Sequence, residues 1–493
     1  MKLHFRKWIC AFLAVALCFC AVTPAFAADA APAETQTGDA AYPLVLVRGM
    51  DFDGLYDDPA FTQKSFKGIT FGGVMKTLWK TFTGTFRSGF YDALAVAAVD
   101  YCYDLMGTMA MDENGDSVYE VREDARNGRI SENERLLKLM DEKEATDEEA
   151  FLITAGKALG YDNVYFYEYD FRLDPYLLAD EVHAMIEKAK ADHGCDKVDL
   201  VNCSMGGVIT DAYLYKYGNE SLHKVTFISS TFCGTDMATD LFRGKVEITE
   251  QMLYNYLVRF LGEGFLPKAL KKTGLLSGVA KFAMKFVEKE KDYVFSTFLL
   301  DVFGTMPSFW ANVQPDQLEE CIAYMFPTEE MQQHYAGAIE RARRMGRVMA
   351  TMPETLTALP ENGTQVAVLG SYNLSVVPVY ESAKYQGDGI LDSRYVLGRA
   401  EVSEIGGRLP ETDDPNRLAY RSADGCIDLS CALFPDNTFV IRDADHVPCV
   451  TDTDLARLFE WIITTDQVTN NMEGGYPAFM VMNKKTHALS KLQ

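Results

Sequence analysis

Short apolar runs alternate along the chain with longer stretches in which apolar residues recur at helical spacing. A compact apolar run bounded by turn residues predicts a buried strand, whereas recurrence every three to four residues predicts an amphipathic helix. The runs that predict strands are 42–50, 163–173, 197–203, 224–236, 364–371 and 437–446. The stretches that predict helices are 174–194, 205–218 and 452–463. Strands that alternate with helices predict an α/β fold with a doubly wound, mostly parallel sheet covered on both faces.

Two long stretches without this alternation interrupt the predicted sheet, at about 51–160 and at 240–363. We therefore expect a core in two parts, 42–239 and 364–465, with the first stretch inserted into the first part. The second stretch is expected to form a helical cap between the two parts. Residues 466–493 are expected to be a C-terminal tail.

The predicted cap contains a basic amphipathic segment in an otherwise acidic chain. Residues 266–300 carry seven lysines interleaved with Leu, Phe and Met at helical spacing, whereas the whole chain has a formal net charge of -24. One interpretation is a helical cap that packs its apolar face on the core. The other is a mobile lid that touches a lipid surface with that face, its lysines attracted to anionic head groups. Both interpretations place the cap over the end of the sheet.

The first 27 residues have the pattern of a secretory signal. They combine a basic start, an apolar stretch of signal-peptide length and small residues at Ala25 and Ala27. We expect a cleaved signal peptide at 1–27 and a flexible leader at 28–41. No later segment is apolar for long enough to span a bilayer, so the sequence predicts a secreted protein without a transmembrane segment.

The composition predicts no cofactor, metal or nucleic-acid partner. A strongly acidic chain repels nucleic acid, and the cysteines beyond the signal form no CxxC pair. Cys426 and Cys431 could close a small loop after export. The segment DENGDS at 112–117 fits a hairpin turn better than a calcium loop, because its glycine comes too early for an EF-hand.

The stretch VDLVNCSMGG, at 198–207, raises the possibility of a nucleophile because an apolar run ends at Ser204 and turns into glycines. Acyl transfer by a serine needs a base to remove its proton, an acid to orient the base, and two backbone donors for the oxyanion. On a doubly wound sheet these groups belong after the strands, in the order serine, acid, histidine.

His446 is the histidine that fits the position of the base. It follows the predicted strand at 437–446 and precedes a helix, whereas the other histidines beyond the signal lie before Ser204, ahead of a strand, inside the cap or in the tail. For the acid, Asp388 lies between two glycines after the strand at 364–371, and Asp392 is the alternative. The oxyanion donors would be the backbone N–H groups of Met205 and, from the turn after the first strand, Met50.

Several motifs resemble those of the α/β-hydrolase lipases, in the branch that contains lecithin:cholesterol acyltransferase and related bacterial secreted lipases. The motifs are VLVRGM, YEYDFRLDPYLLADEV, VDLVNCSMGGVI, GDGIL and DADHV. The resemblance covers roughly 42–235 and 364–465, and the two insertions only loosely. Phe171 stands where this branch has Trp, Asn202-Cys203 replaces a small residue and a histidine, and Arg48 replaces a frequent histidine.

The resemblance implies an α/β-hydrolase fold with a cap or lid, and acyl-ester lipids as substrates. The sequence thus favours a secreted serine carboxylester hydrolase, a lipase or esterase that works through an acyl-enzyme on Ser204. Three alternatives stay open: an acyltransferase on the same triad, an amidase or peptidase on it, and a non-catalytic protein that binds a lipid or a protein. Cys203 is a weaker candidate nucleophile, because its side chain should point away when that of Ser204 points into the site.

Overall fold

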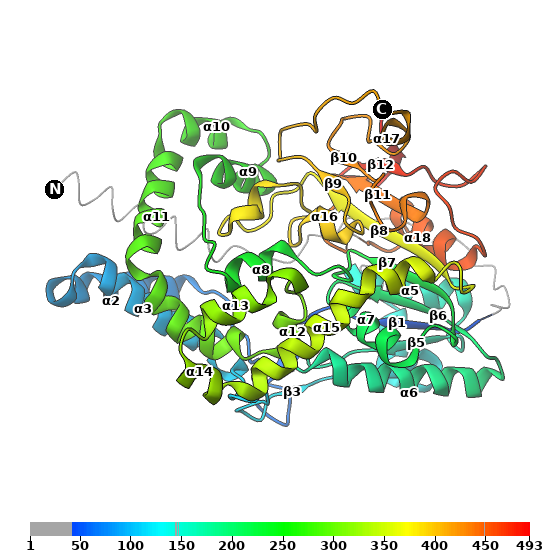
Figure 1. Ribbon diagram of the computed structural model, residues 1–493, viewed down its shortest axis with the longest axis horizontal. Helices are drawn as coiled ribbons and strands as arrows, with labels where there is room; N and C mark the ends of the chain where they lie inside the picture. The colour runs from blue at the N-terminus through cyan, green and yellow to red at the C-terminus, as the bar shows by residue number, and fades with distance from the viewer. Residues whose placement is uncertain (1–41, 143–144, 146, 448) are drawn as a thin grey trace.

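The computed structural model describes residues 42–142, 145, 147–447 and 449–493. The expected signal peptide at 1–27 and the expected leader at 28–41 lie outside the described residues. Figure 1 shows a central twisted sheet with helices on both faces and a helical region beside it.

A nine-stranded sheet forms the centre of the molecule, in the order β13-β12-β11-β8-β7-β6-β1-β5-β4. The strands from β12 to β5 in that order run parallel, and the edge strands β13 and β4 pair antiparallel with their neighbours. The strands are β1 (Leu44–Val47), β4 (Gly128–Arg129), β5 (Val164–Tyr167), β6 (Val198–Cys203), β7 (Leu222–Ile228), β8 (Gln365–Tyr372), β11 (Thr438–Arg442), β12 (Phe479–Met482) and β13 (Leu489–Lys491). The predicted α/β fold with a doubly wound, mostly parallel sheet is confirmed.

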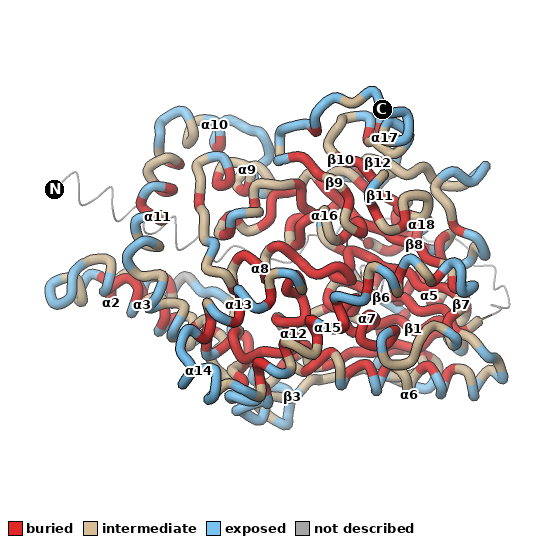
Figure 2. Tube along the Cα trace, viewed as in Figure 1, coloured by how far each residue is buried: buried red, intermediate tan, exposed pale blue. Residues whose placement is uncertain are grey.

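The central strands are buried on both faces, as their uninterrupted apolar runs predict. In β1, Val45 and Val47 belong to one core cluster and Leu44 and Leu46 to another, and all four are fully buried. Successive side chains of a strand point to opposite faces, so the two clusters lie on the two sides of the sheet. Figure 2 shows this buried band running through the molecule.

Helices cover each face through the apolar stripes seen in the sequence. On one face lie α6 (Pro175–His193), α7 (Gly206–Tyr217) and α15 (Ala336–Ala358), and on the other lie α5 (Asp147–Leu159) and α18 (Asp454–Thr464). The expected limits of α6 are confirmed. Asp174 caps its start by accepting a hydrogen bond from the N–H of Tyr176, and Gly194 ends it in the left-handed conformation.

The first insertion contains a pair of antiparallel helices, α2 (Phe71–Ser88) and α3 (Phe90–Met106), which projects from the body at the left of Figure 1. The segment DENGDS forms a hairpin turn, as expected, because Met111 and Ser117 pair antiparallel across it. The smaller elements of this insertion are β2 (Leu55–Tyr56), η1 (Gly107–Met109), β3 (Arg122–Glu123), η2 (Ile130–Glu132) and α4 (Glu134–Met140).

The second insertion is helical and packs partly on the first. The basic segment expected as one amphipathic stretch divides into α10 (Phe265–Lys272), α11 (Leu275–Val294) and the π-helical η3 (Phe295–Gly304). The apolar face of α11 packs against α3 and α9. The other elements before α15 are α8 (Asp236–Phe242), α9 (Glu250–Leu261), α12 (Pro307–Trp310), η4 (Pro315–Gln317), α13 (Leu318–Met325) and α14 (Glu329–His334).

The segment 466–493 is not a simple tail, and this expectation was wrong in part. It contributes β12, which extends the parallel sheet beyond β11, and β13, which pairs antiparallel at the edge. In β12, Met480 and Met482 are buried while Phe479 and Val481 are half-buried. The strand is a run of only four apolar residues close to the end of the chain, too short for its pattern to identify a strand, which explains why it was missed.

The region between β8 and β11 holds short elements that surround the Gly-Asp-Gly turn. They are η5 (Glu381–Lys384), α16 (Ser393–Val396), β9 (Glu401–Val402), α17 (Pro415–Ala419), β10 (Ile427–Asp428) and η6 (Pro435–Asn437). Cys426 and Cys431 are free thiols here. Within the described ranges, no helix combines the length and the apolar character that crossing a membrane requires.

Candidate active site

Ser204 occupies a strained turn between β6 and α7. Its φ is +48°, a left-handed conformation that a non-glycine residue adopts only where the surroundings enforce it. Backbone hydrogen bonds on both sides supply that enforcement. The N–H of Ser204 donates to the carbonyl of Ile228 at 3.0 Å, and its own carbonyl accepts from the N–H groups of Gly207 at 3.1 Å and Thr231 at 2.9 Å.

The two glycines after Met205 are required by close approach of the backbone. A Cβ at Gly206 would lie 2.9 Å from the carbonyl oxygens of both Val47 and Arg48. A Cβ at Gly207 would collide with Ser230 and lie 2.7 Å from the backbone nitrogen of Phe232. The sequence Ser-Met-Gly-Gly therefore fits a turn that is wedged between the ends of β1 and β7.

Asn202 and Cys203, the departures from the resembling family, both lie away from solvent. Asn202 is fully buried, and its Oδ1 accepts a hydrogen bond from the hydroxyl of Ser230 at 2.7 Å. Cys203 is also fully buried, in the cluster on the α5 and α18 face. Burial raises the pKa of its thiol well above the usual value, so the reactive thiolate is suppressed.

His446 joins Ser204 to Asp388. Its Nε2 lies 2.9 Å from the Oγ of Ser204, and its Nδ1 lies 2.7 Å from Oδ2 of Asp388. The second carboxylate oxygen, Oδ1, accepts from the N–H groups of Ile390 at 3.0 Å and Leu391 at 2.8 Å. The Asp388 side chain is fully buried, whereas that of His446 is 14% exposed. The carboxylate is thus fixed, and the imidazole stays within reach of a substrate.

Asp392, the alternative acid, has a different place in the structure. It caps α16 by accepting from the N–H of Tyr395, and it accepts from the N–H of Asp236 at 2.9 Å. Burial, followed by the nearby carboxylate of Asp236, raises the pKa of Asp392 to about 8. The contact that orients His446 is therefore made by Asp388.

The turn after β1 lies against the nucleophile. A Cβ at Gly49 would lie 2.6 Å from Cβ of Ser204, so only glycine allows this approach. The next residue, Met50, carries the N–H group expected to face an oxyanion, and Met205, at the start of α7, carries the other. The structure thus brings the expected residues from β1, β6, β8 and β11 to one end of the sheet.

A charged cluster next to this turn was missed from the sequence. The Arg48 guanidinium forms ion pairs with Asp51 at 2.9 Å, with Glu148 at 3.2 Å and with Glu168. The N–H of Gly49 donates to Oε1 of Glu148 at 2.9 Å. Glu148 lies in α5, within the first insertion, and nothing in its sequence context distinguishes it from an ordinary helical glutamate.

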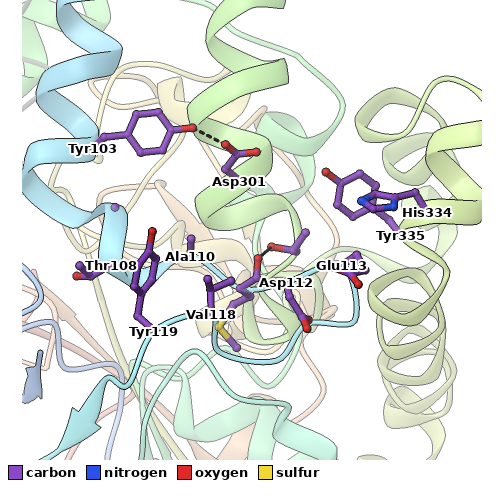
Figure 3. Close-up of a pocket in the computed structure, with 13 residues that line it drawn as sticks. Tyr103, Thr108, Ala110, Asp112, Glu113, Val118, Tyr119, Asp301, His334 and Tyr335 are labelled. Carbon is purple, nitrogen blue, oxygen red and sulfur yellow. Dashed lines mark hydrogen bonds between the residues drawn. The ribbon is translucent and has the colours of Figure 1, made fainter.

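An open cavity of about 460 Å³ lies between the first insertion and the helices of the second. Figure 3 shows Tyr103 pointing toward Asp301, to which its hydroxyl donates a hydrogen bond at 2.5 Å. Ser204, Asp388 and His446 do not line this cavity. In the part of the chain that the structure describes, no His, Cys, Asp and Glu side chains come together in a group of three or more that could hold a metal ion.

Comparisons with known proteins do not identify a family or an activity for this site. No protein-family model matches the chain, and no curated protein matches it. Among solved structures, a chain of "The crystal structure of Tle4-Tli4 complex" is 12% identical, with 68% of this chain and 75% of that chain covered and a TM-score of 0.23. A likeness of this size carries no argument, so the function has to be argued from the site.

Proposed function

We propose that the protein is a secreted serine carboxylester hydrolase of the lipase or esterase type. The observation that carries the proposal is the hydrogen-bonded chain from Ser204 through His446 to Asp388, with Ser204 held at positive φ. A positive φ at a serine costs free energy, and such strain concentrates at functional sites. A buried carboxylate, an imidazole and a hydroxyl in this order form the arrangement that activates a serine for acyl transfer.

The proposed reaction follows from these contacts. The Oγ of Ser204 attacks the ester carbonyl while Nε2 of His446 takes its proton and then passes it to the leaving alcohol. Asp388 accepts the hydrogen bond from Nδ1–H, which keeps Nε2 free to act as the base. Water then attacks the acyl-enzyme, again with His446 as base, and the acid leaves. The N–H groups of Met50 and Met205 would stabilise the oxyanion in both steps.

Exposed apolar side chains on the projecting helices support a lipid substrate. In α2, Trp79, Phe82 and Phe86 follow one another at helical spacing on one face, and Phe86 is 78% exposed. In α10, Phe265 is 87% exposed. The charge is basic on α10, which contains Lys268, Lys271 and Lys272, whereas Lys76 and Lys80 of α2 pair with Asp104 and Asp100 of α3. Exposed aromatic side chains suit the interface of a lipid layer, and the lysines of α10 suit an anionic one.

The proposal is tested with the mature protein and its Ser204→Ala and Cys203→Ala variants. Each is treated with a fluorescent fluorophosphonate and assayed on p-nitrophenyl esters of increasing acyl length. Labelling and turnover that disappear only in Ser204→Ala would support the proposal, and a preference for long acyl chains would favour a lipase. No labelling and no turnover in the parent protein would overturn it.

A further inference from the structure

We propose that Glu148 is a positioning residue that holds the turn Arg48–Gly49–Met50 against Ser204. The inference rests on the proposed function, because it assigns the residue that sets the geometry of the second oxyanion donor. Glu148 belongs to α5, near the C-terminal end of the first insertion, whereas the turn follows β1 directly before the insertion begins. Its contact with Gly49 therefore connects the insertion to the site.

The first support is geometric. Oε1 of Glu148 accepts the N–H of Gly49 at 2.9 Å, and a Cβ at Gly49 would lie only 2.5 Å from that same oxygen. The same Cβ would lie 2.6 Å from Cβ of Ser204. Gly49 is thus held between the carboxylate and the nucleophile. Because the peptide that follows Gly49 carries the N–H of Met50, fixing Gly49 limits where that donor can lie.

The second support is the charge around the turn. Arg48 pairs with Glu148 of α5 and, across the turn, with Asp51. The ion pairs therefore connect the start of the turn to α5 and the two ends of the turn to each other. Glu168, which is 3% exposed, completes the cluster through Arg48 and Arg126. Buried charges are costly unless they are paired, and removing one partner leaves the other uncompensated. The cluster is therefore expected to have few alternative arrangements.

The pH dependence of the turn follows from the same contacts. The groups that face Glu148 are Arg48 and Asp51 from the turn, Tyr169 from the segment after β5, Cys203 at the end of β6 and His446 from the loop after β11. Burial raises the pKa of Glu148 to about 7, against the opposing effects of Arg48, the Gly49 N–H and His446. Below that pH the carboxyl is protonated, its ion pair with Arg48 is lost, and its hydrogen bond to Gly49 weakens.

The test compares Glu148→Ala and Glu148→Gln with a control from the same insertion, Glu134→Gln. Glu134 is exposed at the start of α4 and takes no part in the charged cluster around Arg48. For each variant, kcat and KM on a short p-nitrophenyl ester are measured as a function of pH. Inhibition by a boronic acid, which forms a tetrahedral adduct with the serine, reports on the oxyanion site. Thermal unfolding and the circular dichroism spectrum check the fold.

We expect Glu148→Ala to lower kcat by about 10- to 100-fold with little change in KM, since a displacement of about 1 Å near the reacting atoms costs on the order of 100-fold. Boronate binding should weaken by a similar factor. Glu148→Gln should recover part of the kcat that Glu148→Ala loses, because its amide oxygen can still accept from Gly49 although the ion pair with Arg48 is lost. Because glutamine does not titrate, the acid limb of its pH profile should lack the ionisation of Glu148. Glu134→Gln should behave as the parent protein.

Two results would overturn the inference. One is a folded Glu148→Ala variant with the kcat and boronate affinity of the parent. The other is a Glu148→Gln variant as impaired as Glu148→Ala at every pH, which would mean that the charge matters and the hydrogen bond to Gly49 does not. If the parent protein is neither labelled by the fluorophosphonate nor active, the proposed function itself fails, and the inference fails with it.

Discussion

Nε2 of His446 lies 2.9 Å from Oγ of Ser204, although 242 positions separate the two residues in the chain. The sheet makes this approach possible. Ser204 follows β6 and His446 follows β11, and because β6, β7, β8 and β11 run parallel, the ends of these strands meet at one edge. Asp388, from the segment after β8, reaches the same edge and fixes the imidazole from the other side.

The choice between the two candidate acids gives the first prediction. Asp388→Asn should lower kcat by about 10³- to 10⁴-fold, because an amide that presents its NH₂ to Nδ1 stabilises the wrong imidazole tautomer. Asp392→Asn should leave kcat much closer to that of the parent, since Asp392 contacts Tyr395 and Asp236 instead. Steady-state kinetics on one ester distinguish the two. Equal losses of kcat in the two folded variants would argue against Asp388 as the orienting acid.

The second prediction concerns the glycines that follow the nucleophile Ser204. Gly207→Ala should lower the free energy of unfolding by about 1–3 kcal/mol, because the added methyl group enters occupied space against the backbone of Phe232. Activity should fall as well, since the turn that holds Ser204 must shift. The matched control is Gly72→Ala in α2, where a Cβ would meet nothing within 4 Å. Urea denaturation that finds Gly207→Ala as stable as Gly72→Ala would contradict the tight packing of this turn.

A buried acid on α7 gives the third prediction, which concerns stability and pH. Asp211 is fully buried, and neither carboxylate oxygen has a hydrogen-bond partner. Burial raises its pKa well above the usual value. The folded protein therefore keeps a proton that the unfolded chain releases above about pH 4. It follows that the contribution of Asp211 to stability is full below that pH and is lost as the pH rises toward the folded-state pKa.

The measurement is the free energy of unfolding at several values between about pH 5 and about pH 8. Replacing Asp211 by Asn should remove a downward slope of up to about 1.4 kcal/mol per pH unit. The exposed Asp196→Asn serves as the control and should keep the slope of the parent. The same slope in Asp211→Asn and the parent would show that this carboxyl is ionised in the folded protein.

The sequence predicted the elements whose pattern is local and strong. The uninterrupted apolar runs of β1 and β6 are buried on both faces, and position after a strand identified Ser204 and His446 without any contact information. The choice between Asp388 and Asp392 could not be made that way, because the turns after Asp388 decide which carboxylate faces the imidazole. The role of Glu148 could not be predicted from the sequence for a similar reason, because it depends on tertiary contact between α5 and the turn after β1.

The last prediction concerns the exposed apolar face of α2. The chain has four tryptophans, and beyond the expected signal peptide they are Trp79, Trp310 and Trp461. Trp79 is 66% exposed, whereas Trp310 is buried and Trp461 half-buried. Fluorescence of the protein prepared without residues 1–27 should therefore shift to shorter wavelength when anionic phosphatidylglycerol vesicles are added, because Trp79 leaves water for the head-group region. Zwitterionic vesicles should give a smaller shift, since the lysines of α10 and α11 then lack their counter-charge.

A charge substitution on this face tests how much it contributes to the affinity for vesicles. Phe86→Asp should weaken vesicle binding by more than about tenfold, because burying a phenylalanine side chain contributes roughly 1.5–3 kcal/mol. Leu418→Asp is the matched control: Leu418 is 51% exposed, but it lies on α17, well away from α2 in Figure 1. Vesicle co-sedimentation measures both variants. If Phe86→Asp sediments like the parent, or if Leu418→Asp loses binding equally, the face formed by Trp79, Phe82 and Phe86 is not the surface that meets lipid.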